Sequence, residues 1–243
     1  MSKQQLFYET VVPVSSDQHG KYSIDASIGY PFTRGINSVP LMALEFPQAV
    51  GEYPIVFAQN GDEFIPVVIL GARQDENLFL GDDNAWLASY VPAFIRRYPF
   101  VFSISEDEAN FTLCVDESHP GFNAEGRGEA LFTAEGKLTP YVENLINFLQ
   151  ECRLQMHRTQ AFAKTLKELD LLEPMEAELV LDSGEKQLLA GFHAIDHNRL
   201  KSLSAETLHK LVASDELELI YMHLVSLRNF DGIKKRLAAK KAA

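Results

Sequence analysis

The sequence predicts an α+β fold, in which a β-rich N-terminal half packs on a helix-rich C-terminal half that contains one hairpin. Two observations lead to this prediction. Before Gly136, short apolar runs alternate with turns rich in glycine, proline and serine, which is typical of strands. After Gly136, apolar residues recur at the three- and four-residue spacing of helices, and strand-like runs are confined to one hairpin.

The N-terminal half is expected to begin as an arm and to continue as strands. Residues 1–38 are poor in helix signals and rich in turn residues, so we expect an extended arm. Asn60-Gly61 is a favoured hairpin dipeptide between two apolar runs, so those runs should pair. The predicted strands are 53–58, 64–71, 100–104 and 111–116.

A helical segment is expected between the two pairs of strands. Trp86, Tyr90 and Phe94 occur at four-residue steps, which would place them on one helical face. Pro92 disfavours helix at the residue before it. Two short helical turns, the second opening at Pro92, therefore fit better than one long helix.

The C-terminal half is predicted to contain four helices and one hairpin. Thr139 and Pro140 offer a capping oxygen and a proline for the first turn, so a helix should start there. A second helix should end before Pro174, and the hairpin should turn at Ser183-Gly184. The first two helices are marked by Tyr141, Leu145, Phe148 and Cys152, then by Phe162, Leu166 and Leu169, and the closing helices are 204–213 and 215–229.

These segments are expected to form one compact globular unit, because no flexible linker marks a boundary near residue 136. The expected parts are an extended arm 1–38, a β-rich part 39–136, a helix-rich part 137–230 and a basic tail 231–243.

The charge of the chain argues against nucleic acid and anionic lipid as partners. The net charge is −12, yet the last ten residues hold five Lys or Arg and no acid. The remainder therefore carries 17 basic against 34 acidic residues and repels phosphate groups. The basic tail is interpreted as a solvated helix end favoured by the helix dipole, with contact to an acidic partner as the alternative.

A cytoplasmic protein without a membrane span is expected. No window approaches 18 uninterrupted apolar residues, and the N-terminus lacks the apolar core of a signal peptide. The two cysteines, Cys114 and Cys152, show no CxxC spacing, which fits a reducing compartment.

Motifs of known catalytic or cofactor chemistry are missing from the sequence. GxSxG, GxGxxG and HExxH do not occur, so no cofactor and no metal are expected. The alternative metal or catalytic set is His193, Asp196 and His197, joined in space by His223. Asp196, however, precedes a predicted helix, where it would serve as an N-cap. His223 lies on an apolar helical stripe, which favours a satisfied core or interface histidine.

Two adjacent arginines in the stretch "YVPAFIRRYPF" define the candidate binding site, which comprises Trp86, Tyr90, Arg96, Arg97 and Tyr98. Neighbouring residues on a helix point about 100° apart, so the two arginines should lie in different surroundings. In one interpretation, one arginine pairs with a carboxylate and the other is exposed. In the other, one arginine lies beside the aromatic residues as an anchor for a partner's carboxylate or peptide chain.

Several blocks resemble the SapC family in order and spacing, from about Val39 to Phe230. They include "NLFLGDDNAWLASYVPAFIRRYPFVF", "GEALFTAEGKLTPYVENLINFL" and "GFHAIDHNRLKSL". The family takes its name from a bacterial locus for a surface-layer protein, and the resemblance implies no enzymatic activity. A peptide-transport permease of the same name spans the membrane, which this chain cannot do. His197 stands where the family pattern has an acidic residue, which counts against a metal role there.

The resemblance and the missing catalytic motifs together indicate a soluble, non-catalytic binding or accessory protein. Its ligand would be a protein or peptide connected with the bacterial cell surface. One alternative is a peptide- or protein-modifying enzyme that uses the His/Asp set. A second alternative is a structural surface-layer component.

A homodimer is one of two explanations for the last predicted helix, "LELIYMHLVSLRNF". This segment is apolar around much of its circumference, so it must be covered on more than one side. Either the N-terminal half of the chain or a second subunit would cover it.

Overall fold

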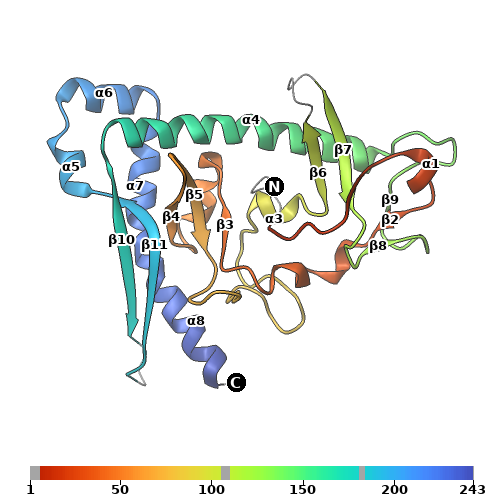
Figure 1. Ribbon diagram of the computed structural model, residues 1–243, viewed down its shortest axis with the longest axis horizontal. Helices are drawn as coiled ribbons and strands as arrows, with labels where there is room; N and C mark the ends of the chain where they lie inside the picture. Colours follow the sequence, from red (N-terminus) through yellow and green to blue (C-terminus); the bar gives the residue numbers. More distant parts are fainter. Residues whose placement is uncertain (1–5, 105–109, 181–183, 243) are drawn as a thin grey trace. The chain divides into compact units, whose positions relative to one another are not determined.

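A computed structural model of the chain describes residues 6–104, 110–180 and 184–242 (Figure 1). Most of the strands lie in the N-terminal half and most of the helical residues in the C-terminal half, so the predicted α+β class is confirmed. The chain forms two compact units, each built from separate segments. The first unit is Met1–Arg34, Leu80–Trp86 and Ile95–Arg153, and the second is Gly35–Phe79, Leu87–Phe94 and Leu154–Ala243.

The first unit contains two small antiparallel sheets. One has the strand order β1-β7-β6 and the other β8-β2-β9. A core of apolar side chains from these strands and from the start of α4 is buried, including Ile24, Phe100, Val115, Leu131 and Val142. The elements are β1 (Val11–Pro13), α1 (Ser16–His19), β2 (Ser23–Ile24), η1 (Ala26–Ile28), η2 (Pro31–Thr33), β6 (Phe100–Ile104), β7 (Phe111–Asp116), β8 (Phe122–Asn123) and β9 (Glu129–Ala130).

The second unit contains a five-stranded antiparallel sheet with the order β10-β11-β4-β5-β3. Helices α7 and α8 pack against one face of this sheet (Figure 1). The elements are β3 (Ser38–Pro40), η3 (Ala43–Glu45), α2 (Phe46–Ala49), β4 (Ile55–Asn60), β5 (Glu63–Ile69), β10 (Leu172–Val180), β11 (Lys186–Ile195), α5 (His197–Ser202), α6 (Ala205–Ala213), α7 (Glu216–Ser226), η4 (Leu227–Asn229) and α8 (Phe230–Ala242). Two further helices, α3 (Ala93–Arg96) and α4 (Pro140–Glu168), contribute residues to both units.

The strand predictions are confirmed. The Asn60-Gly61 turn joins β4 to β5, with Asn60 paired to Glu63 and Gly61 at a φ of 61°. The predicted strands at 100–104 and 111–116 are β6 and β7. The predicted C-terminal hairpin is β10–β11, although Ser183 of its expected turn lies outside the described residues.

The prediction that Trp86, Tyr90 and Phe94 lie on one helical face is wrong. Only Ala93–Arg96 is helical, directly after Pro92 as expected for the second turn. The preceding backbone forms turn hydrogen bonds instead: Gly81 N donates to Ala85 O, and Leu87 N donates to Phe79 O. Because of these hydrogen bonds, the backbone before Ala93 is not helical. Residues four positions apart therefore do not share a face there.

The two helices expected between Thr139 and Pro174 are one helix, α4, of 29 residues. The polar stretch near its middle interrupts the apolar stripe but contains no glycine or proline, so the backbone hydrogen bonds continue. Pro174 then lies within β10 rather than just after a helix.

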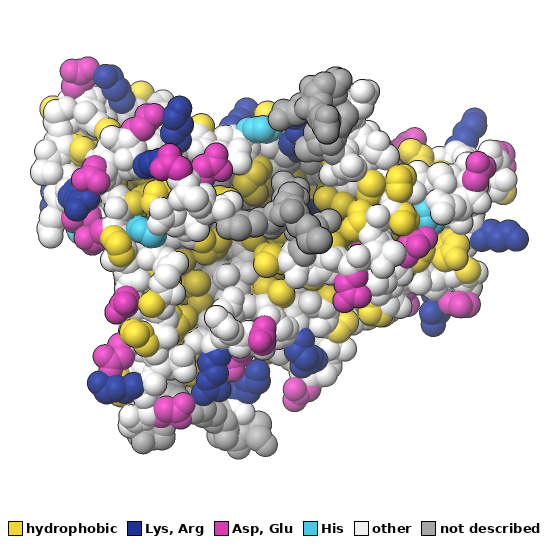
Figure 2. Space-filling model, in the orientation of Figure 1, with side chains coloured by type: hydrophobic (Ala, Val, Ile, Leu, Met, Phe, Trp, Pro, Cys, Tyr) yellow, Lys and Arg dark blue, Asp and Glu magenta, His cyan; other side chains and the backbone are white. Residues whose placement is uncertain are grey.

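The closing helices agree with the prediction at 204–213 and 215–229, which correspond to α6 and to α7 with η4. The basic tail continues as α8, which buries Ile233 and Leu237 completely. Figure 2 shows Lys and Arg side chains gathered over α8, so the positive charge of the tail lies on the outside of a packed helix.

Within the described ranges, none of the helices is both long enough and apolar enough to cross a lipid bilayer.

Candidate functional site

Four partly exposed aromatic side chains follow one another on the first unit. Phe32 lies between Phe7 and Tyr30, with ring centroids 5.1 and 6.2 Å away, and Tyr30 contacts Trp86 at 5.7 Å. All three pairs meet edge to face, which is a favourable geometry for aromatic rings. We call Phe7, Tyr30, Phe32 and Trp86 the aromatic strip.

A turn at residues 80–86 brings Trp86 to Tyr30. The two sides of this turn pair at Leu80 and Trp86, and Tyr30 N donates to Asn84 O at 2.9 Å. A Cβ on Gly29 would lie 2.3 Å from the same carbonyl oxygen, so only glycine permits this approach. Arg34 adds a hydrogen bond to Asn84 Oδ1 at 2.7 Å, which places a guanidinium beside the strip.

Buried polar rings lie behind Phe32. Its ring centroid is 4.3 Å from that of Tyr98 and 6.1 Å from that of His119. Burial, and then the nearby Asp116 carboxylate, raise the pKa of Tyr98. Burial lowers the pKa of His119 to about 4, while the Asp116 charge opposes this shift. Both side chains are therefore neutral at pH 7, and His119 Nδ1 accepts a hydrogen bond from Gly121 N at 3.0 Å.

Asp116 ties this layer to the N-terminal segment. Its carboxylate is fully buried and accepts hydrogen bonds from Glu9 N at 2.8 Å, Thr10 N at 3.0 Å and the Tyr98 hydroxyl at 3.3 Å. The Ser118 amide and hydroxyl also donate to it. Burial by itself would raise the pKa of Asp116, but these hydrogen bonds outweigh it and lower the pKa. The charged carboxylate thus holds the segment that carries Phe7.

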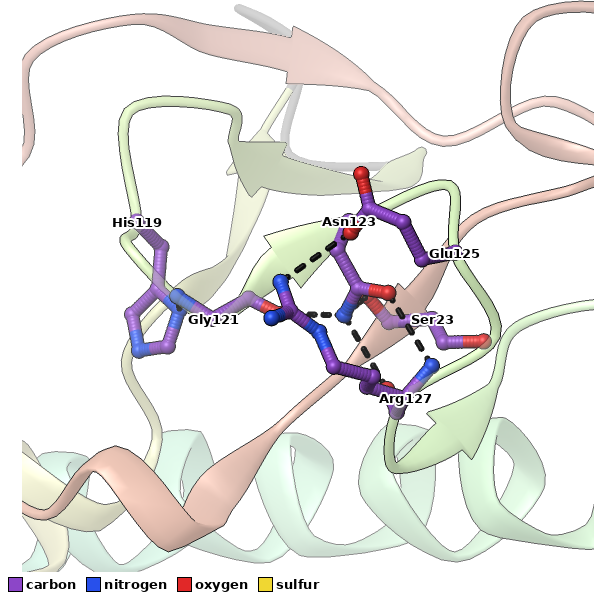
Figure 3. Close-up of polar contacts among 6 residues, drawn as sticks. All are labelled: Ser23, His119, Gly121, Asn123, Glu125 and Arg127. Atoms are coloured by element: carbon purple, nitrogen blue, oxygen red, sulfur yellow. Dashed lines mark hydrogen bonds and ion pairs between the residues drawn. The ribbon is translucent and has the colours of Figure 1, made fainter.

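The loop after His119 is closed by a second polar network (Figure 3). Asn123 Nδ2 donates to the carbonyl oxygens of Ser23, Gly121 and Arg127, and its Oδ1 accepts from Arg127 N. A Cβ on Gly121 would lie 2.2 Å from Asp25 O. The buried amide and the glycine therefore fix the backbone that positions His119.

The two arginines of the predicted site lie in different surroundings. Arg97 is partly buried beside Tyr8, whose hydroxyl donates to Phe100 O at 2.8 Å. Burial raises the pKa of Tyr8 to about 12, and the charge and hydrogen bond of Arg97 oppose this rise. Arg96 is exposed, and its guanidinium carbon lies 5.1 Å from the ring centroid of Phe148.

Tyr90, also part of the predicted site, belongs to the second unit. Its hydroxyl donates to Glu45 Oε1 at 2.6 Å, and its carbonyl oxygen accepts from the Tyr53 hydroxyl. Glu45 is buried and also accepts hydrogen bonds from Met42 N and Ala93 N. Tyr90 is thus fastened into the framework of its own unit.

The other two aromatic residues of the predicted site, Trp86 and Tyr98, both belong to the first unit. Ring contacts through Tyr30 and Phe32 connect them. Sequence reasoning missed Phe7, Tyr30, Phe32, Asp116 and His119. The arm was expected to be extended with turns, and nothing in its spacing indicates that its aromatic residues meet Trp86.

The alternative His/Asp set makes mostly structural contacts. His223 is fully buried, with Nε2 accepting from Ile195 N at 3.0 Å and Nδ1 donating to Ile55 O at 2.8 Å. Burial lowers its pKa to about 4. Asp196 is the N-cap of α5, as the sequence predicted, and accepts from Asn198 N and Arg199 N.

The other two histidines face aromatic rings. His193 on β11 packs edge to face on Phe64 at 4.8 Å, and the part of the chain that the structure describes offers its buried Nδ1 no hydrogen-bond partner. His197 contacts Tyr221 at 6.4 Å. Among the described residues, no three His, Cys, Asp or Glu side chains are grouped so that they could hold a metal ion.

Comparison with protein-family models gives a match. The model of the SapC family matches residues 14–233, which is most of the chain. None of the curated proteins and none of the solved structures matches it. Because the family match covers nearly the whole sequence, including both compact units, the chain belongs to the SapC family.

Proposed function

We propose that this protein is a soluble, non-catalytic binding or accessory protein whose ligand is a protein or peptide connected with the bacterial cell surface. The observation that carries the proposal is the aromatic strip. Partly exposed Trp, Tyr and Phe side chains lie there in one row, with Arg34 beside it and Arg97 beside Tyr8, whose ring stacks on Phe7. Trp, Tyr and Arg dominate the binding energy of protein interfaces.

The rigid backing of the strip supports a binding role. Tyr98, His119 and Asp116 are buried behind it and joined by hydrogen bonds and ring contacts. A preformed surface loses little side-chain freedom when a ligand binds, so more of the contact energy remains as affinity. The connection with the cell surface rests on membership of the SapC family.

A peptide-modifying enzyme is less well supported. His223 uses both ring nitrogens, and Asp196 uses its carboxylate, for hydrogen bonds within the fold. Recruiting either residue to a reaction would break contacts that the second unit needs.

A capture experiment tests the proposal. The wild-type chain and Trp86→Ala are used as bait in a lysate of the native host, and captured proteins are identified and titrated. The matched control is Phe111→Ala, because Phe111 is 40% exposed in the same unit but is not part of the strip. We expect Trp86→Ala to weaken binding of the captured ligand about thirtyfold, as for a 2 kcal/mol hot spot, while the variant remains folded at the temperature of the assay. Equal capture by all three proteins would contradict the proposal.

The proposal also places the protein in the cytoplasm, which agrees with its two free cysteines. Cell fractionation tests this part. Recovery of most of the protein outside the inner membrane would contradict it and would favour the surface-layer alternative.

A further inference from the structure

Helix α7 presents a stripe with an apolar centre and opposite charges at its ends. Tyr221 and Val225 are 47% and 45% exposed, and Met222 lies between them. Glu218 is exposed one turn before this centre, and Arg228, in η4 directly after α7, is exposed at the far end of the stripe. We call these five residues the α7 stripe. Together with Val50, which follows α2, its first four residues line an open groove.

The opposite side of α7 is committed to the core. Ile220, His223 and Ser226 are fully buried, and His223 and Ser226 bond to the backbone of Ile55 at the start of β4. The α7 stripe therefore cannot turn inward. Within the described residues, neither Glu218 nor Arg228 forms an ion pair with another side chain of the chain.

Four of the five residues of the stripe are placed symmetrically about position 223. Glu218 and Arg228 lie equally far on either side of position 223, and Tyr221 and Val225 do the same. A two-fold interface brings the same patch of two subunits together. If one residue of the first subunit contacts a different residue of the second, the reverse contact also forms across the axis. An antiparallel pair of these helices would set Glu218 opposite Arg228 twice and Tyr221 opposite Val225 twice.

We propose that the α7 stripe is a self-association surface and that its occupant is a second copy of this chain, with the two α7 helices antiparallel. The antiparallel arrangement pairs unlike charges at both ends, whereas a parallel arrangement would set Glu218 against Glu218 and Arg228 against Arg228. A ligand with a single sign of charge would meet a like charge at one end. The apolar centre supplies the buried area, and the end charges select the register.

Charge reversal with rescue tests the arrangement. Sedimentation at micromolar concentrations compares the wild type with Glu218→Arg, Arg228→Glu and the double variant. We expect each single reversal to weaken self-association at least about tenfold, because one like-charge contact then forms at each end. The double variant should return to nearly the wild-type affinity, because it restores an unlike pair at both ends.

The controls separate this surface from general charge effects. Glu143→Arg makes the same charge change at an exposed site on the first-unit part of α4 and should leave self-association unchanged. Val225→Asp should abolish it while the melting temperature stays near that of the wild type. A wild-type chain that is monomeric at micromolar concentration, or a dimer that tolerates both reversals, would overturn the proposal. Weakened single variants without rescue in the double variant would overturn the antiparallel arrangement.

Discussion

At the scale of single residues, the first unit depends on a buried charge that is satisfied by backbone amides and side-chain hydroxyls. Asp116 is completely buried, yet five hydrogen bonds compensate its carboxylate. An ionised group in this position is stabilising only while its donors stay in place. The donors Glu9 N and Thr10 N belong to the segment that presents Phe7, so the same contact serves both stability and the shape of the aromatic strip.

We expect Asp116→Asn to lower the free energy of unfolding by on the order of 3 kcal/mol, because the amide nitrogen would face donor groups. Urea unfolding measures the loss. The control is Asp25→Asn, a partly exposed aspartate of the same unit that also accepts from the amide and hydroxyl of a nearby serine. The control should lose much less, and equal losses would show that burial of the Asp116 carboxylate is not what matters.

The adjacent arginines should contribute unequally. Arg97 is partly buried beside the Tyr8 hydroxyl, whereas Arg96 is exposed over the Phe148 ring. We expect Arg97→Ala to lower the free energy of unfolding by on the order of 2 kcal/mol, because the hydrogen bond and the packing of the side-chain stem are lost together. Arg96→Ala should change it by less than about 1 kcal/mol, the size of an exposed cation–π contact. Similar urea midpoints for the two variants would contradict this division.

At the scale of elements, the strands and their turns were predictable from the sequence because their signals are local. Asn60-Gly61 supplies the turn between β4 and β5, and apolar residues mark the strands on each side. The position of Trp86 was not predictable in the same way. Its partner Tyr30 comes from the N-terminal arm, and the contact depends on the hydrogen bond between Tyr30 N and Asn84 O. A long-range bond of this kind leaves no periodic signal.

Helix α4 is one continuous helix where the sequence predicts two. The sequence predicts two helices here because the apolar stripe stops after Cys152. A helix needs continuous backbone hydrogen bonds rather than a continuous apolar stripe, and residues such as Arg, Gln and Met are good helix formers. The structure keeps one helix from Pro140 to Glu168, and the chain leaves it at Asp170 with a φ of 53°.

The loop after β7 gives a test at the same scale. Gly121→Ala would place a Cβ 2.2 Å from the backbone oxygen of Asp25, which cannot move without disturbing β2. We expect a loss of about 2 kcal/mol in the free energy of unfolding and a change in the NMR signals of the His119 ring. Gly51→Ala is the control, because no atom lies within 4 Å of its added Cβ. A Gly121→Ala variant as stable as the control would show that the close approach is relaxed in solution.

At the scale of the whole molecule, a buried histidine in each of the two units makes the folded chain less stable at acidic pH. His119 in the first unit and His223 in the second both have a pKa near 4, against an ordinary value near 6.5. Each of these histidines therefore binds its proton at a lower pH in the folded chain than in the unfolded chain. Stability from this source is complete above pH 6.5 and is lost as the pH falls from 6.5 toward 4. The general charge effect has the opposite sign, because protonation reduces the self-repulsion of a chain with a net charge of −12.

The histidine effect should prevail because burial acts directly on the two imidazoles, whereas the charges of the surface are screened by salt. We expect the free energy of unfolding to fall between pH 7 and pH 5 by about 2 kcal/mol for each buried histidine, given 1.36 kcal/mol for each pH unit below 6.5. Urea unfolding at a series of pH values measures the slope, and His223→Gln should reduce it by about half. The general charge term is the same in both proteins and cancels in the comparison. Ring NMR signals give an independent reading, since His119 and His223 should remain neutral at pH 5. A slope that is unchanged in His223→Gln, together with a His223 ring that titrates near pH 6.5, would show that this histidine is not held neutral by the fold.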